Sequence, residues 1–357
     1  MADVLLRPAA PDDAAAVVAL SGLVHPYLVR GEAAIRRTIT QPPPGEDWTA
    51  FVAVSDGAPV GWVAAMRNPR SAEPDFGQIS LLQVHPEARR RGIGDALFAA
   101  AAAHLRAAGI RRTTAISRPD SLPFARRHGF QPSRELRFSA LNLPSRTSSS
   151  GSSSLPGSGS LSGSSSLPGS GSLSGSSSLP GSGSLSGSLS LSGLPSWAVS
   201  SVSSVSSGEA DGIRLMSLRE TTPEALYAAD VAAATDEPGD APPQPPSFAT
   251  WRYDIWDNPD LDHDLSIAAV LNGEIVSFSL LARVGTRVWS DMTATAPAHR
   301  GRGLARRTKT EALRRAAAAG VTTAFTSNDE SNAPMLAVNT HLGYHPVATQ
   351  FACVATL

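Results

Sequence analysis

The 357-residue sequence contains one cysteine, Cys353, so it cannot form an internal disulfide. It has no apolar run of about 18 residues that could cross a bilayer, and its first residues show neither a basic region nor a cleavable apolar stretch. No set of His, Cys, Asp or Glu has the spacing of a metal site, and no Ser/His/Asp grouping is evident. We therefore expect a cytoplasmic protein with no metal and no membrane partner.

Lysine is almost absent, because 29 of the 30 basic residues are Arg and only Lys309 is Lys. We interpret this bias as GC-rich coding and attach no function to it. The net charge is −1, with 17 Arg against 13 acids in residues 1–145 and 12 basic residues against 18 acids in residues 208–357. Neither part has the basic excess that phosphate-driven binding requires, so we expect no nucleic-acid partner.

A low-complexity tract separates two ordinary segments. The unit GSSSLPGSGSLS occurs three times over 151–186, within a Ser/Gly/Leu/Pro tract at 146–207. Each unit offers two Leu, which is too little apolar area for a solenoid to offset the entropy of ordering. We predict a disordered linker with a root-mean-square span of about 40–50 Å. The N-terminal domain (1–145) and the C-terminal domain (208–357) are then separate folding problems with no fixed orientation.

The two flanks share one pattern. Each begins with an apolar run and a helical pattern, and continues with two strands joined by a hairpin dipeptide, Asp56-Gly57 or Asn272-Gly273. A strand, a turn and a long Ala-rich helix follow at 79–109 and 288–320. A β-branched run, a short helix and further strands complete each flank. The predicted order is β-α-β-β-β-α-β-α-β, an α/β fold with a mixed sheet and flanking helices in each domain.

The turn between the strand and the long helix carries the chemistry. It reads Arg89-Arg90-Arg91-Gly92-Ile93-Gly94 in the first flank and Arg300-Gly301-Arg302-Gly303-Leu304-Ala305 in the second. A helix N-terminus offers unpaired N–H groups and a partial positive charge, and small residues let these donors close around a pyrophosphate. The turn is neither the dinucleotide fingerprint nor a P-loop, because it follows a later strand and no Gly-Lys exists in the chain.

With these two turns, both flanks resemble GCN5-related N-acetyltransferase (GNAT) domains, whose acyl-CoA motif is Q/R-x-x-G-x-G/A. The tandem layout resembles that of mycothiol synthase-like proteins. The resemblance implies transfer of an acetyl group from acetyl-CoA to an amine, by direct attack in a ternary complex. A small-molecule primary amine is the expected acceptor. A protein amino group, or a non-catalytic CoA-responsive binding protein, are the alternatives.

The same resemblance implies where the acyl donor binds, with the pyrophosphate on the turns and the pantetheine arm beside the preceding strand. The implied contacts are Val84, Arg89, Arg90, Arg91, Gly92, Ile93 and Gly94 in the first domain, and Thr295, Arg300, Gly301, Arg302, Gly303, Leu304, Ala305, Asn332 and Asn339 in the second.

An acid on the strand before the turn distinguishes the two domains. Asp291 can serve as the base that deprotonates the amine, and period-2 alternation would place it on the same face as Thr293 and Thr295. The first domain has Ser80 at this place, so we predict a catalytic second domain and a degenerate first one. Where many family members carry a Tyr acid, this chain has Ala125 and Asn339. Tyr344 is the nearest aromatic hydroxyl, either an acid or a core residue.

An aromatic and acidic cluster precedes the hairpin of the second domain. Trp251, Tyr253 and Trp256 lie among five Asp residues between 254 and 264. Aromatic walls with carboxylates suit a cationic amine, so these three form a candidate acceptor pocket. A solvated acidic loop packed by its aromatics is the alternative. The sequence predicts neither the acceptor's identity nor the oligomeric state.

Overall fold

The computed structural model describes residues 4–144, 212–234 and 238–357. We call the first range the N-lobe and the other two the C-lobe. The predicted linker, 146–207, lies outside these ranges, so its disorder stays a prediction. The elements of the N-lobe are β1 (Val4–Pro8), α1 (Ala14–Val24), α2 (Glu32–Thr40), β2 (Thr49–Ser55), β3 (Ala58–Arg67), β4 (Phe76–Val84), α3 (Ile93–Ala107), β5 (Arg112–Ser117), α4 (Leu122–Arg127) and β6 (Gln131–Asn142).

The C-lobe repeats this order. Its elements are β7 (Arg214–Ser217), α6 (Pro223–Ala233), α7 (Phe248–Trp251), the π-helix η7 (Arg252–Trp256), β8 (Ile267–Leu271), β9 (Glu274–Val284), β10 (Arg287–Thr295), α8 (Leu304–Ala318), β11 (Thr323–Asp329), α9 (Ala333–His341) and β12 (His345–Thr356). The predicted mixed α/β fold is confirmed, with one further helix in each lobe (α2, and α7 with η7) between the first helical segment and the hairpin.

The hairpins form because their dipeptides accept a left-handed backbone. Asp56 and Gly57 have φ values of 52° and 76°, and Asn272 and Gly273 have values of 52° and 88°. Positive φ at both central residues gives the turn whose twist matches two antiparallel strands. The hairpins β2–β3 and β8–β9 are therefore fixed locally.

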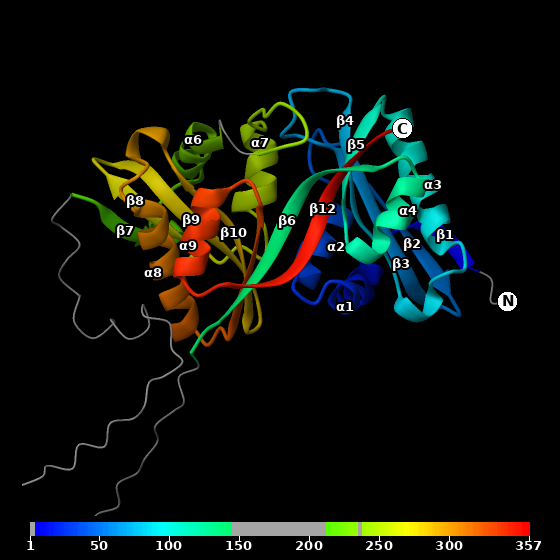
Figure 1. The fold of residues 1–357 in the computed structure, drawn as a ribbon, viewed down its shortest axis with the longest axis horizontal. Helices are drawn as coiled ribbons and strands as arrows, with labels where there is room; N and C mark the ends of the chain where they lie inside the picture. Colours follow the sequence, from blue (N-terminus) through cyan, green and yellow to red (C-terminus); the bar gives the residue numbers. More distant parts are fainter. Residues whose placement is uncertain (1–3, 145–211, 235–237) are drawn as a thin grey trace, which may run out of the picture. The chain divides into compact units, whose positions relative to one another are not determined.

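The last strand of each lobe pairs with the other lobe. The described strands form one sheet in the order β1-β2-β3-β4-β5-β12-β6-β11-β10-β9-β8-β7. Strand β12 lies antiparallel between β5 and β6, and β6 also pairs with β11. Figure 1 shows β6 and β12 side by side between the lobes. The expectation that the flanks fold as separate problems without a fixed orientation is therefore wrong, because each lobe needs a strand from the other.

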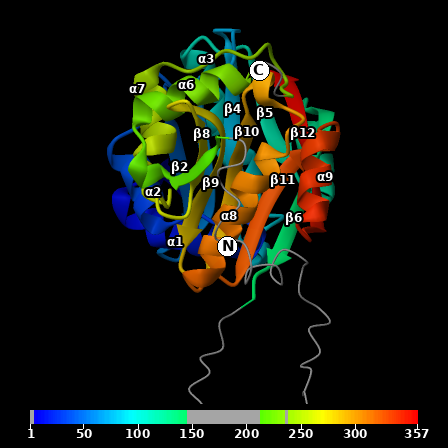
Figure 2. The ribbon, with the colours of Figure 1, turned by 90° about the vertical axis from the view of Figure 1, so that its left-hand side faces the viewer.

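Helices cover both faces of the sheet. In the C-lobe, α6 and α7 pack on one face through Leu226 and Trp251, and α8 packs on the other through Leu313 and Ala316 (Figure 2). In the N-lobe, α1 and α2 share one cluster and α3 belongs to another. No helix in the described ranges is both long and apolar enough to span a bilayer.

Polar contacts also join the lobes. Asp240 accepts hydrogen bonds from Thr114, Ser133 and Arg134 of the N-lobe. The backbone N–H of Gly31 donates to the buried carboxylate of Asp260 at 2.7 Å. These contacts place N-lobe side chains beside the C-lobe site described next.

Candidate functional site

The turn before α8 has a left-handed backbone at its two glycines. Gly301 and Gly303 have φ values of 73° and 72°, and Gly303 is the N-cap of α8. A Cβ built on Gly301 would meet no atom within 4 Å, and one on Gly303 would meet only Arg306 Nη2, at 3.9 Å. Arg300 is turned back, with its Nε donating to the carbonyl of Thr295. The N–H groups at the start of the helix are therefore open to an anion.

Strands β10 and β11 separate beside this turn. Their parallel ladder runs only from Arg287–Thr323 to Trp289–Phe325, although both strands continue. Beyond the ladder they line a cavity of about 1100 Å³. The lining combines strand residues 291–295 and 326–329, the turn and start of α8 (Arg300, Gly301, Gly303, Leu304, Ala305, Arg306), Lys309, helix α9 residues and the N-lobe residues Arg70, Arg134 and Leu136.

Asp291 lines this cavity, but it does not share a face with Thr293 and Thr295. The register of β10 against β9 shifts between Ser290 and Thr293, so a bulge interrupts the alternation. Thr293 and Thr295 bond with Ser279 and Ser277 of β9. The predicted common face is therefore wrong, since a bulge adds a residue that period-2 counting cannot see.

The hydrophobic cluster into which α8 packs identifies the two faces of the sheet. Leu281 of β9 packs in the cluster of α8, and Ser279 lies two residues before it on the same face. Met292, next to Asp291, packs instead against the cluster of α6 and α7. The carboxylate of Asp291 accepts a bond from Trp289 Nε1 at 3.3 Å. Asp291 therefore faces the side of α6.

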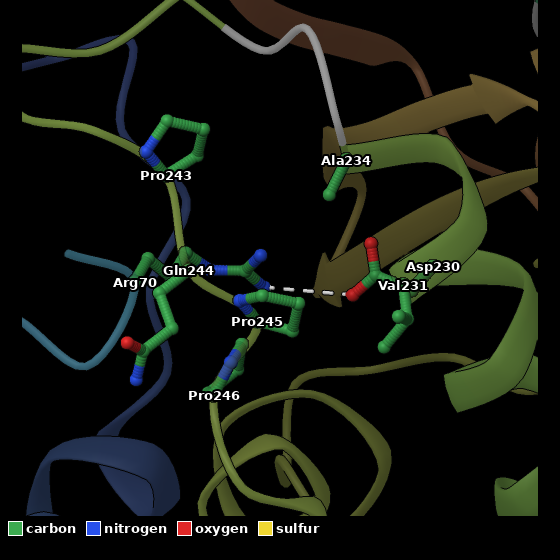
Figure 3. Close-up of a pocket in the computed structure, with 8 residues that line it drawn as sticks. All are labelled: Arg70, Asp230, Val231, Ala234, Pro243, Gln244, Pro245 and Pro246. Carbon is green, nitrogen blue, oxygen red and sulfur yellow. Dashed lines mark ion pairs between the residues drawn. The ribbon is translucent and has the colours of Figure 1, made fainter. Parts of the chain in front are cut away.

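The charge environment of Asp291 comes from both lobes. Its side chain is exposed where it opens onto the cavity, yet the surrounding protein desolvates the carboxyl and raises its pKa, while the charge of Arg70 partly offsets this. Arg70 forms an ion pair of 3.6 Å with Asp230 of α6. Figure 3 shows this pair among the residues that line a smaller cavity, between α6 and the prolines at 243, 245 and 246. The volume of this cavity is about 210 Å³. An ammonium group near Asp291 would find a carboxylate whose charge is only partly compensated.

Two predicted asparagines lie where β11 meets α9. Asn332 caps α9, with its Oδ1 accepting from the N–H of Met335, and it lines the cavity. Asn339 donates to Asn328 Oδ1 at 2.6 Å. Within the described residues, the buried Oδ1 of Asn339 has no hydrogen-bond partner. Asn339 itself does not line the cavity, although Met335 and Val338 on the same helix do.

Tyr344 does not reach the cavity lining. Its side chain is buried in the α8 cluster, and its hydroxyl has no hydrogen-bond partner in the part of the chain that the structure describes. Burial raises its pKa. Between Tyr344 and the cavity stands Lys309, whose Nζ lies 5.0 Å from the centre of the Tyr344 ring. Lys309 lines the cavity, and nothing in its sequence context except being the chain's only lysine pointed to this place.

Other residues that the sequence predicts as contacts of the acyl donor have side chains in the cores or beside the turn. Ile93 and Leu304 are buried in the cores, so they could contribute only main-chain N–H groups. Arg302 Nη1 lies 3.2 Å from His299 Nδ1, beside the turn. Arg306 lines the cavity three residues after the N-cap, at the positive end of the helix.

The turn before α3 in the N-lobe has the same backbone conformation as the turn before α8, but different side chains pack over it. Arg90 and Gly92 have φ values of 63° and 79°, matching Gly301 and Gly303. Arg89 Nε donates to the carbonyl of Val84, as Arg300 does to Thr295. Both predicted turns thus have one conformation.

Helix α4 covers the start of α3. A Cβ on Gly94 would lie 3.1 Å from the ring of Phe124, whose counterpart in the C-lobe is the smaller Val338. Asp95, at the position of Arg306, is held by Arg127 and His128. An acid at the helix start and an aromatic ring over it disfavour a diphosphate there.

The predicted aromatic wall does not line the cavity. Trp251 is buried in the core and donates to Asp230 at 2.6 Å. The ring of Tyr253 lies under Arg37 of the N-lobe, and Trp256 packs edge-on against His263. The π-helix that carries Tyr253 contributes only Ile255 to the lining. These aromatics pack against protein, as in the alternative of an acidic loop packed by its aromatics.

Among the described ranges, no group of three or more His, Cys, Asp or Glu could hold a metal ion. The candidate site is a cavity lined by hydrogen-bonding groups and charges, built on a helix N-terminus and two separated strands.

Comparisons with known proteins point to one family. The sequence profile described as "Acetyltransferase (GNAT) family" matches residues 25–130 and 231–344. No curated protein sequence matches the chain. Among solved structures, the GCN5-related N-acetyltransferase from Sphaerobacter thermophilus is similar with a TM-score of 0.61 and 16% identity, covering 99% of this chain and 95% of that one. The tandem GNAT protein from the clavulanic acid biosynthesis pathway has a TM-score of 0.63 and 18% identity, covering 99% and 98%.

Proposed function

Because the chain belongs to the GNAT acetyltransferase family, we propose that its C-lobe transfers an acetyl group from acetyl-CoA to a primary amine of a small molecule, by direct attack. One observation carries this proposal. A single cavity joins the open helix N-terminus at Gly303 to the carboxylate of Asp291.

The residues present fit acetyl-CoA. The N–H groups at the start of α8 and the side chain of Arg306 would hold the diphosphate. The unpaired edges of β10 and β11 would bond the amide groups of the arm. When bound, acetyl-CoA supplies the acetyl thioester.

Asp291 would bind the acceptor ammonium and take its proton. A base works best when its pKa lies near the working pH, and burial moves the pKa of Asp291 upward in that direction. The charge of Arg70 limits this rise in the pKa of Asp291.

The N-lobe would serve as a structural partner and not as a second enzyme. Its turn is covered by Phe124 and carries Asp95 in place of Arg306. It supplies Arg70, Arg134 and Leu136 to the cavity of the C-lobe. These side chains wall the cavity on the N-lobe side, which supports a small acceptor more than a protein chain.

The test is CoA release by the full-length protein against a panel of small amines and amine-terminated peptides, with product masses. Acetylation of a small amine, abolished by Gly303→Val and retained in Gly92→Val, is the expected result. CoA binding without turnover on any amine would favour the non-catalytic CoA-responsive protein, and acetylated peptides alone would favour a protein substrate.

A further inference from the structure

Lys309 on α8 is a buried amine that faces an aromatic ring. The residue is 1% exposed, and its Nζ lies over the ring of Tyr344. The same helix position in the N-lobe, six residues after the N-cap glycine, holds Phe98. An apolar side chain therefore suits the fold here, so packing does not explain the only lysine of the chain.

Lys309 and Asp291 reach the cavity from opposite faces of β10. Lys309 contacts the ring of Tyr344 on the side of α8, where the neighbouring strand residue is Ser290. Asp291, the next residue along, faces the side of α6, because successive residues of a strand point to opposite faces. A thioester attacked by an amine beside Asp291 would then have α8 and Lys309 on its other side.

The surroundings of Lys309 let it exchange a proton near neutral pH. Tyr344, Ser290 on β10 and Thr326 on β11 face this region, and the Thr326 hydroxyl is occupied by the carbonyl of Ser290. None of them is a carboxylate. Burial alone lowers the pKa of Lys309 to about 7. An acid with a pKa near the working pH is the effective kind.

On the basis of the proposed function, we propose that Lys309 is the proton donor to the sulfur of CoA in the C-lobe. As the acceptor nitrogen forms its bond to the acetyl carbon, the C–S bond breaks and sulfur keeps the electron pair. Sulfur takes one proton from the Lys309 ammonium. The acceptor ammonium gives up two protons, of which one restores Lys309 and the other leaves through Asp291 to solvent. Lys309 thus does the work that neither Asn339 nor Tyr344 is placed to do.

The first test needs no turnover. CoA is bound to the full-length protein and its thiol is titrated by thiolate absorbance, with desulfo-CoA as the reference. Below pH 7, where Lys309 carries its proton, the thiolate fraction should be about tenfold higher in the parent protein than in Lys309→Met, because an ammonium stabilises a thiolate. Arg314→Met, on the exposed side of the same helix, is the matched control and should behave as the parent. An equal thiolate fraction below pH 7 in Lys309→Met and the parent overturns the proposal.

The second test is kinetic. Lys309→Met should fold with at least the parent's thermal stability, bind CoA, and lose about 100-fold in kcat with little change in KM for acetyl-CoA. The basic limb of its pH profile should disappear, because a donor must be protonated. Lys309→Arg keeps a charge but not a proton that leaves near neutral pH, so it should not restore kcat.

Other outcomes separate this inference from the function it rests on. A kcat within threefold of the parent in Lys309→Met rejects the donor role. An acetyl group found on Lys309 after incubation with acetyl-CoA alone also rejects it, in favour of an acyl-accepting lysine. If the parent acetylates no amine but the thiolate fraction depends on Lys309, the proposed function fails while the contact between Lys309 and sulfur stands.

Discussion

Arg70 of the N-lobe and Asp230 of the C-lobe form an ion pair, with Nη2 of the arginine 3.6 Å from Oδ2 of the aspartate. Both residues line the candidate cavity. The loop of Arg70 is held by the N–H of Gln244, which donates to the carbonyl of Arg70 at 2.8 Å. The N-lobe therefore reaches into the C-lobe site with a fixed positive charge.

Replacing this charge should alter acceptor binding and the pH profile. In Arg70→Gln we expect KM for the amine to change about tenfold and the acid limb of kcat/KM to move to higher pH, because Arg70 lowers the pKa of Asp291. Steady-state kinetics between pH 5 and 9 measure both. Arg252→Gln removes an exposed ion pair with Asp257 and should change neither. An unaltered acid limb in Arg70→Gln would show that Arg70 does not act on the base.

Asp291→Asn should separate activity from stability. We expect kcat to fall by about 100-fold or more, since the base is lost. The pKa of Asp291 is raised in the folded state, so this group favours folding at low pH, and its contribution is lost as pH rises through its ordinary pKa towards the raised value. The variant should therefore melt at a higher temperature than the parent at pH 8, with no gain at pH 3. Full turnover in the variant would remove Asp291 from the mechanism.

The two N-cap glycines offer a matched pair. Gly303→Ala and Gly92→Ala each place a Cβ on a residue with φ above 70°, which costs about 1–2 kcal/mol of folding free energy. Both should lower the melting temperature similarly. Only Gly303→Ala should weaken CoA binding, by about tenfold in Kd measured by calorimetry. Equal losses of affinity in the two variants would show that the N-lobe turn also binds CoA.

Glu46 and Asp254 form a buried pair of carboxyls between the lobes. Glu46 is 3% exposed, and burial, followed by the charge of Asp254, raises its pKa to about 9. Folding then takes up a proton, so stability is greatest below the ordinary glutamate pKa and falls as pH rises towards 9. Glu46→Gln should remove much of this slope and raise the melting temperature at pH 8. Exposed Glu224→Gln is the control, and a parent whose melting temperature does not fall between pH 6 and 9 would contradict the raised pKa.

Because β6 and β12 each pair with the other lobe, we expect that neither half of the chain folds on its own. Residues 1–145 alone would expose the edge of β5, and residues 208–357 alone would expose the edge of β11. We expect each fragment to be aggregated when expressed alone and a 1:1 complex to form on coexpression, as measured by light scattering after size exclusion. A folded monomer of 1–145 would contradict the need for exchange.

Much of the fold was accessible from the sequence because its signals are local. Asp56-Gly57 and Asn272-Gly273 fix their hairpins through their own φ preferences, and the helix-starting turns at Gly92 and Gly303 follow from the same freedom. The order of elements, their repetition and the family resemblance all rest on such short patterns. They need no knowledge of what lies across the sheet.

Only the tertiary structure decided which strands pair with each other. Whether β6 or β12 lies beside β5 depends on which edges meet, and the two last strands carry no local signal for it. The bulge that separates Asp291 from Thr293 adds one residue against β9, which alternation cannot count. The burial of Lys309 and the cover of Phe124 over Gly94 arise from residues far apart in the chain, because packing and desolvation depend on neighbours in space.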